Sequence, residues 1–89
     1  MLQVELWFPE PQSLKEKRMI LKSLVSRVRN KFNVAVAETD GMDLWQKSVL
    51  VIVSVAKDRK QANQVLDYVL DFVRAFHGVE IMKHELELL

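Results

Sequence analysis

Ser48-Val49-Leu50-Val51-Ile52-Val53-Ser54-Val55-Ala56 is the stretch of this sequence that decides the fold. The segment is nearly continuous in apolar, β-branched side chains, which is typical of a strand with both faces at least partly covered. Its longest unbroken apolar run, Val49 to Val53, is far shorter than the roughly 20 residues needed to cross a bilayer. The segment therefore predicts a central strand, and no membrane span is expected.

One helix is predicted on each side of this strand along the chain. Ser13 and Glu16 form a capping-box pair, which predicts a helix from about Leu14 to Lys31. Six apolar residues fall within an arc of about 100° on a helical wheel: Leu14, Leu21, Leu24, Val25, Val28 and Phe32. Asp58, with a glutamine three residues later, repeats the capping arrangement before a second apolar stripe that ends at Phe76. Each predicted helix therefore has one face to bury.

Three further segments are predicted to be strands. Leu2 to Phe8 alternates apolar and polar residues and is followed by a proline, which cannot donate to a strand ladder. Asn33 to Thr39 contains valines and small residues, and Asp40-Gly41 after it supplies turn chemistry. In Val79 to Leu88 the apolar positions change face partway along. We therefore expect either a β-bulge there or a face that is buried by a partner.

The order strand, helix, strand, strand, helix, strand is that of ferredoxin-like α+β domains. We expect a four-stranded antiparallel sheet with the spatial order 4-1-3-2 and two helices on one face. The length of 89 residues and the hydrophobic content of 49% fit a single domain over residues 1–89. In this topology residues 13–18 and residues 38–46 emerge at the same end of the sheet, so cationic and anionic side chains should meet there.

The composition excludes several classes of site. A chain without cysteine cannot form disulfides, thiolate zinc sites or iron–sulfur ligation, and His77 and His84 are too few for a histidine-rich metal site. Gly41 and Gly78 alone cannot build a glycine-rich phosphate loop, and no serine, histidine and carboxylate constellation is indicated. Binding is therefore favoured over catalysis, with no cofactor. The segment Met1 to Glu5 lacks the pattern of a signal peptide, which predicts a cytoplasmic location.

Basic residues are concentrated in the first predicted helix. Between Ser13 and Lys31 there are seven basic residues and one acidic residue, a net charge of +6, so the rest of the chain carries −5 of its total of +1. Such cations could follow a phosphate backbone, whereas the alternative is a solvated face that pairs with acids of the same chain. Four of them lie within about 60° of one another on a helical wheel: Lys15, Arg18, Lys22 and Arg29.

Acidic residues gather at the end of the second strand and in the loop after it. Their oxygens could bind a divalent cation, but ion pairing with the cations at the start of the first helix is the simpler interpretation. The acids are Glu38, Asp40 and Asp43, and the expected cationic partners are Lys15, Lys17 and Arg18.

Trp45 is predicted to lie in the same loop. It could cover the open end of the core, or it could anchor a partner as tryptophans do at protein interfaces. In the second case Gln46 could position a backbone or a ligand by hydrogen bonding. Both residues are therefore candidate contacts for a partner.

The sheet face opposite the helices is the last candidate surface. Gln3, Glu5 and Trp7 are expected on it, beside residues of the apolar third strand. RNA-recognition domains of this topology stack bases on aromatic residues of their central strands, and the third strand has none. An apolar open face more often pairs with a second copy of itself, which would make the chain a homodimer that a charge at Leu50 or Ile52 disrupts.

Three segments of the sequence carry a resemblance that covers essentially the whole chain: Ser13-Leu14-Lys15-Glu16-Lys17-Arg18, Asn33-Val34-Ala35-Val36-Ala37-Glu38 and Asp43-Leu44-Trp45-Gln46-Lys47. Together they are similar to the YlxP-like family of small bacterial proteins of unknown function. The resemblance implies a ferredoxin-like fold in a bacterial cytoplasmic protein. The genes of this family are often found beside genes for transcription elongation, translation initiation and ribosome maturation factors, so the resemblance also suggests work with RNA or ribosomes. Relatives carry other polar residues where this chain has Gly41-Met42, so a side-chain ligand at Gly41 is not expected.

The basic segment and the resemblance together favour a binding module for RNA or ribosomal particles. The alternative is a structural or protein-interaction domain that acts as a homodimer, and a third hypothesis is a cation-dependent enzyme at the three acids named above. No membrane partner is expected. The residues predicted to contact the partner are Lys15, Lys17, Arg18, Lys22, Arg29, Trp45 and Gln46.

Overall fold

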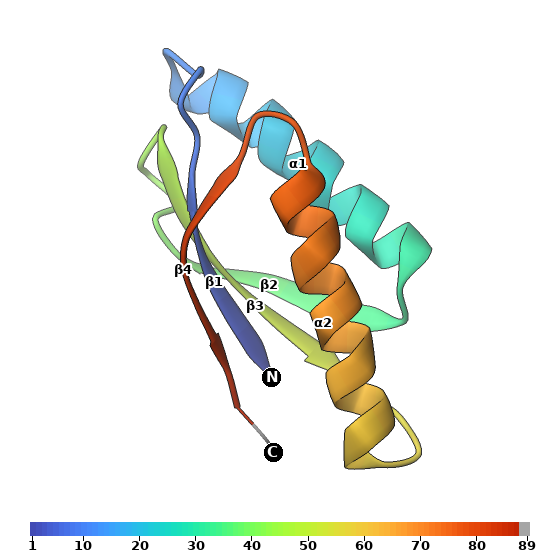
Figure 1. Ribbon diagram of the computed structural model, residues 1–89. Helices are drawn as coiled ribbons and strands as arrows, with labels where there is room; N and C mark the ends of the chain where they lie inside the picture. Colours follow the sequence, from blue (N-terminus) through green and yellow to red (C-terminus); the bar gives the residue numbers. More distant parts are fainter. Residues whose placement is uncertain (88–89) are drawn as a thin grey trace.

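The computed structural model describes residues 1–87. In this part of the chain the four strands form an antiparallel sheet in the order β2-β3-β1-β4, which is the predicted order read from the other edge. Figure 1 shows both helices on the same face of the sheet, so the predicted ferredoxin-like α+β fold is confirmed. The elements are β1 (Leu2–Trp7), α1 (Leu14–Lys31), β2 (Val34–Asp40), β3 (Lys47–Ser54), α2 (Arg59–Ala75) and β4 (Glu80–Leu86).

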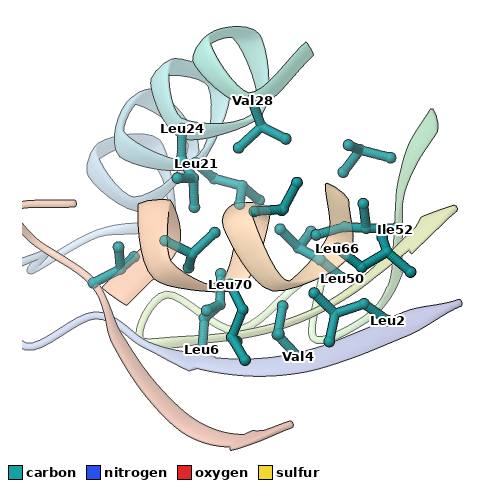
Figure 2. Packing of buried hydrophobic residues seen from close by; sticks show 14 of the residues in the cluster. Leu2, Val4, Leu6, Leu21, Leu24, Val28, Leu50, Ile52, Leu66 and Leu70 are labelled. Atoms are coloured by element: carbon teal, nitrogen blue, oxygen red, sulfur yellow. The ribbon is translucent and has the colours of Figure 1, made fainter. Parts of the chain in front are cut away.

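Most of the core lies between the sheet and the two helices. Every second residue of β1 points into it, as the period-2 pattern of this strand predicts. Figure 2 shows how leucines and valines of α1 and α2 meet those of β1 and β3 in one layer. The residues labelled there are Leu2, Val4, Leu6, Leu21, Leu24, Val28, Leu50, Ile52, Leu66 and Leu70.

The two faces of β3 differ in a way that corrects one expectation. Leu50 and Ile52 are 2% and 1% exposed and face the helices, because they pair with Val4 and Leu2 of β1. They belong to the core and not to the open face. The side chains of β3 on the open face are those of its alternate positions, of which Val51 and Val53 are half-buried.

Both helices begin at the predicted capping residues. The Ser13 hydroxyl accepts a hydrogen bond from the Glu16 backbone N–H at 3.2 Å, and Asp58 accepts one from the Gln61 N–H at 2.8 Å. The Glu16 carboxylate accepts from the N–H of Gln12 at 2.6 Å, one residue before the position that the capping-box pattern predicts. Residues that precede each helix therefore satisfy amides that the helix itself leaves unpaired.

Two irregularities interrupt the sheet. The pairing of β1 with β4 shifts after Glu5, from Lys83 to Ile81, so that Met82 is an extra residue on β4. This is the bulge that the change of face in the sequence indicated. A second shift between Glu38 and Asp40 interrupts the pairing of β2 with β3.

The strand boundaries are close to the predicted ones. The predicted end of the last strand at Leu88 lies outside the described residues, and the other strand boundaries agree to within one or two residues. Among the residues that the structure describes, no helix is both long and apolar enough to span a membrane.

Candidate functional site

Lys17 joins the start of α1 to the end of β2. Its side chain is 0% exposed, and its ammonium donates to a Glu38 carboxylate oxygen at 3.2 Å and to the backbone carbonyl of Gly41 at 2.8 Å. The ammonium also lies 5.8 Å from the centre of the Phe8 ring, within the range of a cation–π contact. Burial lowers the pKa of Lys17, and the bond to Glu38 opposes that shift.

Glu38 is the acceptor at the centre of this end of the molecule. Its two carboxylate oxygens accept hydrogen bonds from the Lys17 ammonium, the Arg18 guanidinium and the Ser48 hydroxyl. Although burial opposes ionisation, these three donors together lower the pKa of Glu38 below its ordinary value. Arg18 also donates to the carbonyl of Met42, so it ties α1 to the loop between β2 and β3. Residues 13–18 and 38–46 therefore share one end of the fold, as the topology predicts.

The three acids of this region have different surroundings. Glu38 is held by the donors described above, whereas the Asp40 carboxylate accepts the N–H of Gly41 at 2.8 Å. Asp40 and Asp43 are both exposed. In residues 1–87 no three histidine, cysteine, aspartate or glutamate side chains gather in a way that could hold a metal ion.

A groove runs between α1 and β2. It has a volume of about 310 Å³, an apolar floor that includes Val25 and Val36, and three cations around it. Arg29 closes one end, where its guanidinium donates to the backbone carbonyl of Val36 at 2.8 Å. We call this depression the basic groove, and it is lined by Arg18, Leu21, Lys22, Val25, Arg29, Val36, Glu38 and Leu50.

Most of the positive charge beside the basic groove is not neutralised by neighbouring acids. Lys15, Lys22 and Arg29 are exposed, and none of them forms an ion pair with a carboxylate of the described residues. Arg18 is paired with Glu38, but about two fifths of its side chain remains exposed. This flank of α1 therefore presents unpaired cations beside an apolar floor.

An exposed apolar loop lies next to the end of the basic groove that Arg18 and Glu38 form. Met42, Leu44 and Trp45 are 47%, 51% and 44% exposed, and we call them the apolar loop. Trp45 thus leaves almost half of its surface to solvent. Gln46 extends the sheet, because its backbone carbonyl accepts the N–H of Phe8 at 2.9 Å. The bond from Arg18 to the Met42 carbonyl fixes the apolar loop relative to the groove.

The sequence predicted the cations of the basic groove but not the groove itself. The groove exists because β2 brings Val36 and Glu38 opposite α1, and this contact between distant segments has no local pattern. The burial of Lys17 did have a signal. On a helical wheel Lys17 falls inside the apolar arc of α1, between Leu24 and Leu21, and not among the other cations.

Comparisons with known proteins agree with the resemblance described above. The model of the family described as "Protein of unknown function (DUF503)" matches residues 1–86. The chain is 43% identical over 68 residues to the "Uncharacterized protein YlxP" of Bacillus subtilis (strain 168), over 76% of this chain and 74% of that protein. Neither description states an activity.

Proposed function

As the chain belongs to the DUF503 family, whose function is unknown, we propose that it is a binding module for RNA, free or within ribosomal particles. The observation that carries this proposal is the basic groove, where three cations surround an apolar floor. Protein sites that bind single-stranded RNA combine a positively charged groove for the phosphates with apolar or aromatic surface for the bases. The basic groove offers both on one flank of α1.

The cations of this flank extend along the helix. Lys15, Lys22 and Arg29 follow one another at intervals of seven residues, which corresponds to about 10 Å of helix length per step. A chain of phosphates along α1 could therefore contact them in turn, while a base enters the groove between the first and last cations. Arg18 would add its charge through the two fifths of its side chain that remain exposed.

The apolar loop supplies the second part of the proposed interface. Trp45 is the aromatic residue of this end with substantial exposed surface, and a ring of this kind can stack on an unpaired base. Lys17 is excluded from direct contact because its side chain is fully buried. Its part in binding would be indirect, since it holds the loop carbonyl of Gly41 in place.

Removing the unpaired cations should weaken binding. We expect the double variant Lys15→Gln, Lys22→Gln to bind single-stranded ribosomal RNA fragments at least tenfold more weakly. Its slope of log affinity against log salt should be shallower by about 1.4, because two phosphate contacts are lost. Fluorescence anisotropy across a salt series measures both quantities. Arg18 is left unchanged because its replacement would also remove an ion pair of the fold.

The matched control is the double variant Lys57→Gln, Lys60→Gln. It makes the same change in net charge at two exposed cations near the start of α2. We expect the control to lose little affinity and to keep the salt slope of the wild type. Equal losses in the two double variants, or wild-type binding without a salt slope, would contradict the proposal.

The open sheet face favours a second candidate function, a homodimer. Val51 and Val53 lie half-buried on this face with the exposed Ala35 and Ala37 of β2 beside them, and neither helix covers them. A second copy could bury this apolar surface.

A charge on this face tests the homodimer. We expect Val51→Lys to convert a dimer to a monomer in light scattering while circular dichroism stays unchanged. Tyr68→Lys, on the exposed side of α2, is the control that should leave the dimer intact. A monomeric wild type at the highest soluble concentration would rule the candidate out. A charge at Leu50 is unsuitable because it would disrupt the core.

A further inference from the structure

A second concave surface lies along the seam between α1 and α2, on the flank of α1 opposite the basic groove. Two adjoining depressions of about 320 and 350 Å³ share Arg27 and Phe72. Both depressions are shallow and open to solvent, so a ligand bound there would stay partly exposed. We call them together the aromatic cleft, and its principal residues are Arg27, Asn30, Lys31, Phe72, Phe76 and His77.

The wall of the aromatic cleft is built from phenylalanine rings with cations over them. Phe72 meets Phe32 edge-on at 5.9 Å between ring centres and meets Phe76 at 6.3 Å. The Arg27 guanidinium lies 5.8 Å from the centre of Phe76, and the Lys31 ammonium lies 5.1 Å from the centre of Phe72. Each cation therefore lies within the range of a cation–π contact with a ring, and its N–H donors remain available to a ligand.

The charge of the aromatic cleft is unbalanced. Arg27 and Lys31 stand one helical turn apart on the same side of α1, where two like charges repel each other. Neither forms an ion pair with a carboxylate anywhere in residues 1–87. His77, at the other end of the cleft, lies 3.9 Å from Glu10. An anion between Arg27 and Lys31 would relieve their repulsion.

We propose that the aromatic cleft binds a nucleotide, with its phosphate against Lys31 and its base on the Arg27 guanidinium. A guanidinium plane supported by an aromatic ring is a platform on which nucleic-acid bases stack. A compact ammonium suits a phosphate as a point charge. The amide of Asn30 can donate and accept hydrogen bonds at the base edge. A simple carboxylate would match the charge but would leave the platform unused.

The nucleotide could be free or could belong to an RNA chain, and the site is independent of the proposed function of the basic groove. We expect AMP and GMP, added separately to the full chain, to shift the amide resonances of residues 27–32 and 72–77 with dissociation constants below about 1 mM. Inorganic phosphate should bind at least tenfold more weakly, because it cannot stack. A pentauridylate tested in parallel identifies the source. UMP is measured in the same way as its reference. Tighter binding of the pentauridylate than of UMP assigns an RNA strand, and equal binding assigns free nucleotides.

Three variants separate the parts of the site. Arg27→Lys keeps the charge but loses the flat platform, so AMP should bind it about as weakly as phosphate. Lys31→Gln should weaken both ligands at least fivefold. Arg74→Gln removes a cation that pairs with Asp71 on α2, and it should change neither affinity.

Several results would overturn the proposal. They are no shifts at these residues, equal affinity of phosphate and AMP, wild-type AMP affinity in Arg27→Lys, or displacement of AMP by a glutamate peptide at equal concentration. Residues 72–77 line no part of the basic groove, so their shifts report on the aromatic cleft alone. The affinity of the double variant Lys15→Gln, Lys22→Gln for ribosomal RNA fragments reports on the basic groove, which separates the failure of one site from the failure of the other.

Discussion

Glu38→Gln is expected to reduce the free energy of unfolding by about 3 kcal/mol or more, because it leaves a fully buried ammonium without its carboxylate. The amide of glutamine would also turn a donor toward Lys17, Arg18 or Ser48, which all donate to the present carboxylate. Urea denaturation monitored by circular dichroism gives the loss. Such a loss is a large part of the total stability of a chain of this size.

The exposed pair of Glu5 with Lys47 provides the matched control. Its ammonium and carboxylate are 3.5 Å apart, and both side chains are substantially exposed. Glu5→Gln should therefore cost about 1 kcal/mol or less. A cycle with Lys17→Met and Glu38→Gln tests whether the buried pair acts as a unit, since the double variant should lose clearly less than the two single losses together. Additive losses, or a loss in Glu38→Gln as small as in Glu5→Gln, would count against the argument.

Glu38→Gln should also change how the free energy of unfolding depends on pH. The pKa of Glu38 is lower in the folded protein than in the unfolded chain, so its contribution is present above about pH 4.3 and is lost as the pH falls toward its folded pKa. The difference between wild type and Glu38→Gln should accordingly shrink in acid. The pKa of Lys17 is lowered by burial, and the loss of Glu38 removes a group that raises it. Because Lys17 then loses its proton at a lower pH in the folded variant than in the unfolded chain, the stability of the variant should rise with pH until the pH passes the ordinary pKa of lysine.

The fold followed from local patterns because each was consistent with its neighbours. The capping residues Ser13 and Asp58 start the helices, the alternation in β1 gives its buried face, and the change of face in β4 indicated the bulge at Met82. The orientation of β3 could not be obtained in the same way. Both of its faces are apolar, so only the pairing of Leu50 with Val4 decides which valines remain outside.

The sequence predicted which charged residues gather at the candidate site, but not what each of them does there. Lys17 and Arg18 stand next to each other in the sequence, yet one is fully buried and the other is two fifths exposed. Their separation follows from the rotation of the helix by about 100° per residue. The acceptors of Lys17 lie 21 and 24 positions away along the chain. Contacts of that kind depend on how β2 and its loop pack against α1, which no local pattern encodes.

The glycine that accepts the bond from Lys17 is the most restricted backbone position of this end. Gly41 has φ of +78°, and a Cβ added there would lie 2.9 Å from the Lys47 carbonyl oxygen and 3.0 Å from the Ser48 Cα. Both contacts are with backbone at the start of β3, which cannot move without disturbing the pairing of the sheet. The left-handed conformation alone costs an L-residue about 1–2 kcal/mol, and the contacts add to this.

We therefore expect Gly41→Ala to lower the free energy of unfolding by about 3 kcal/mol or more. Gly78→Ala is the matched control, since Gly78 is also left-handed with φ of +95° but its added Cβ would meet only Ile20, at an ordinary 3.7 Å. The control should lose about 1–2 kcal/mol, the cost of conformation without the contacts. Urea denaturation of both variants gives the difference. Equal losses would mean that the start of β3 can yield, and that Lys17 rather than the tight turn holds this end together.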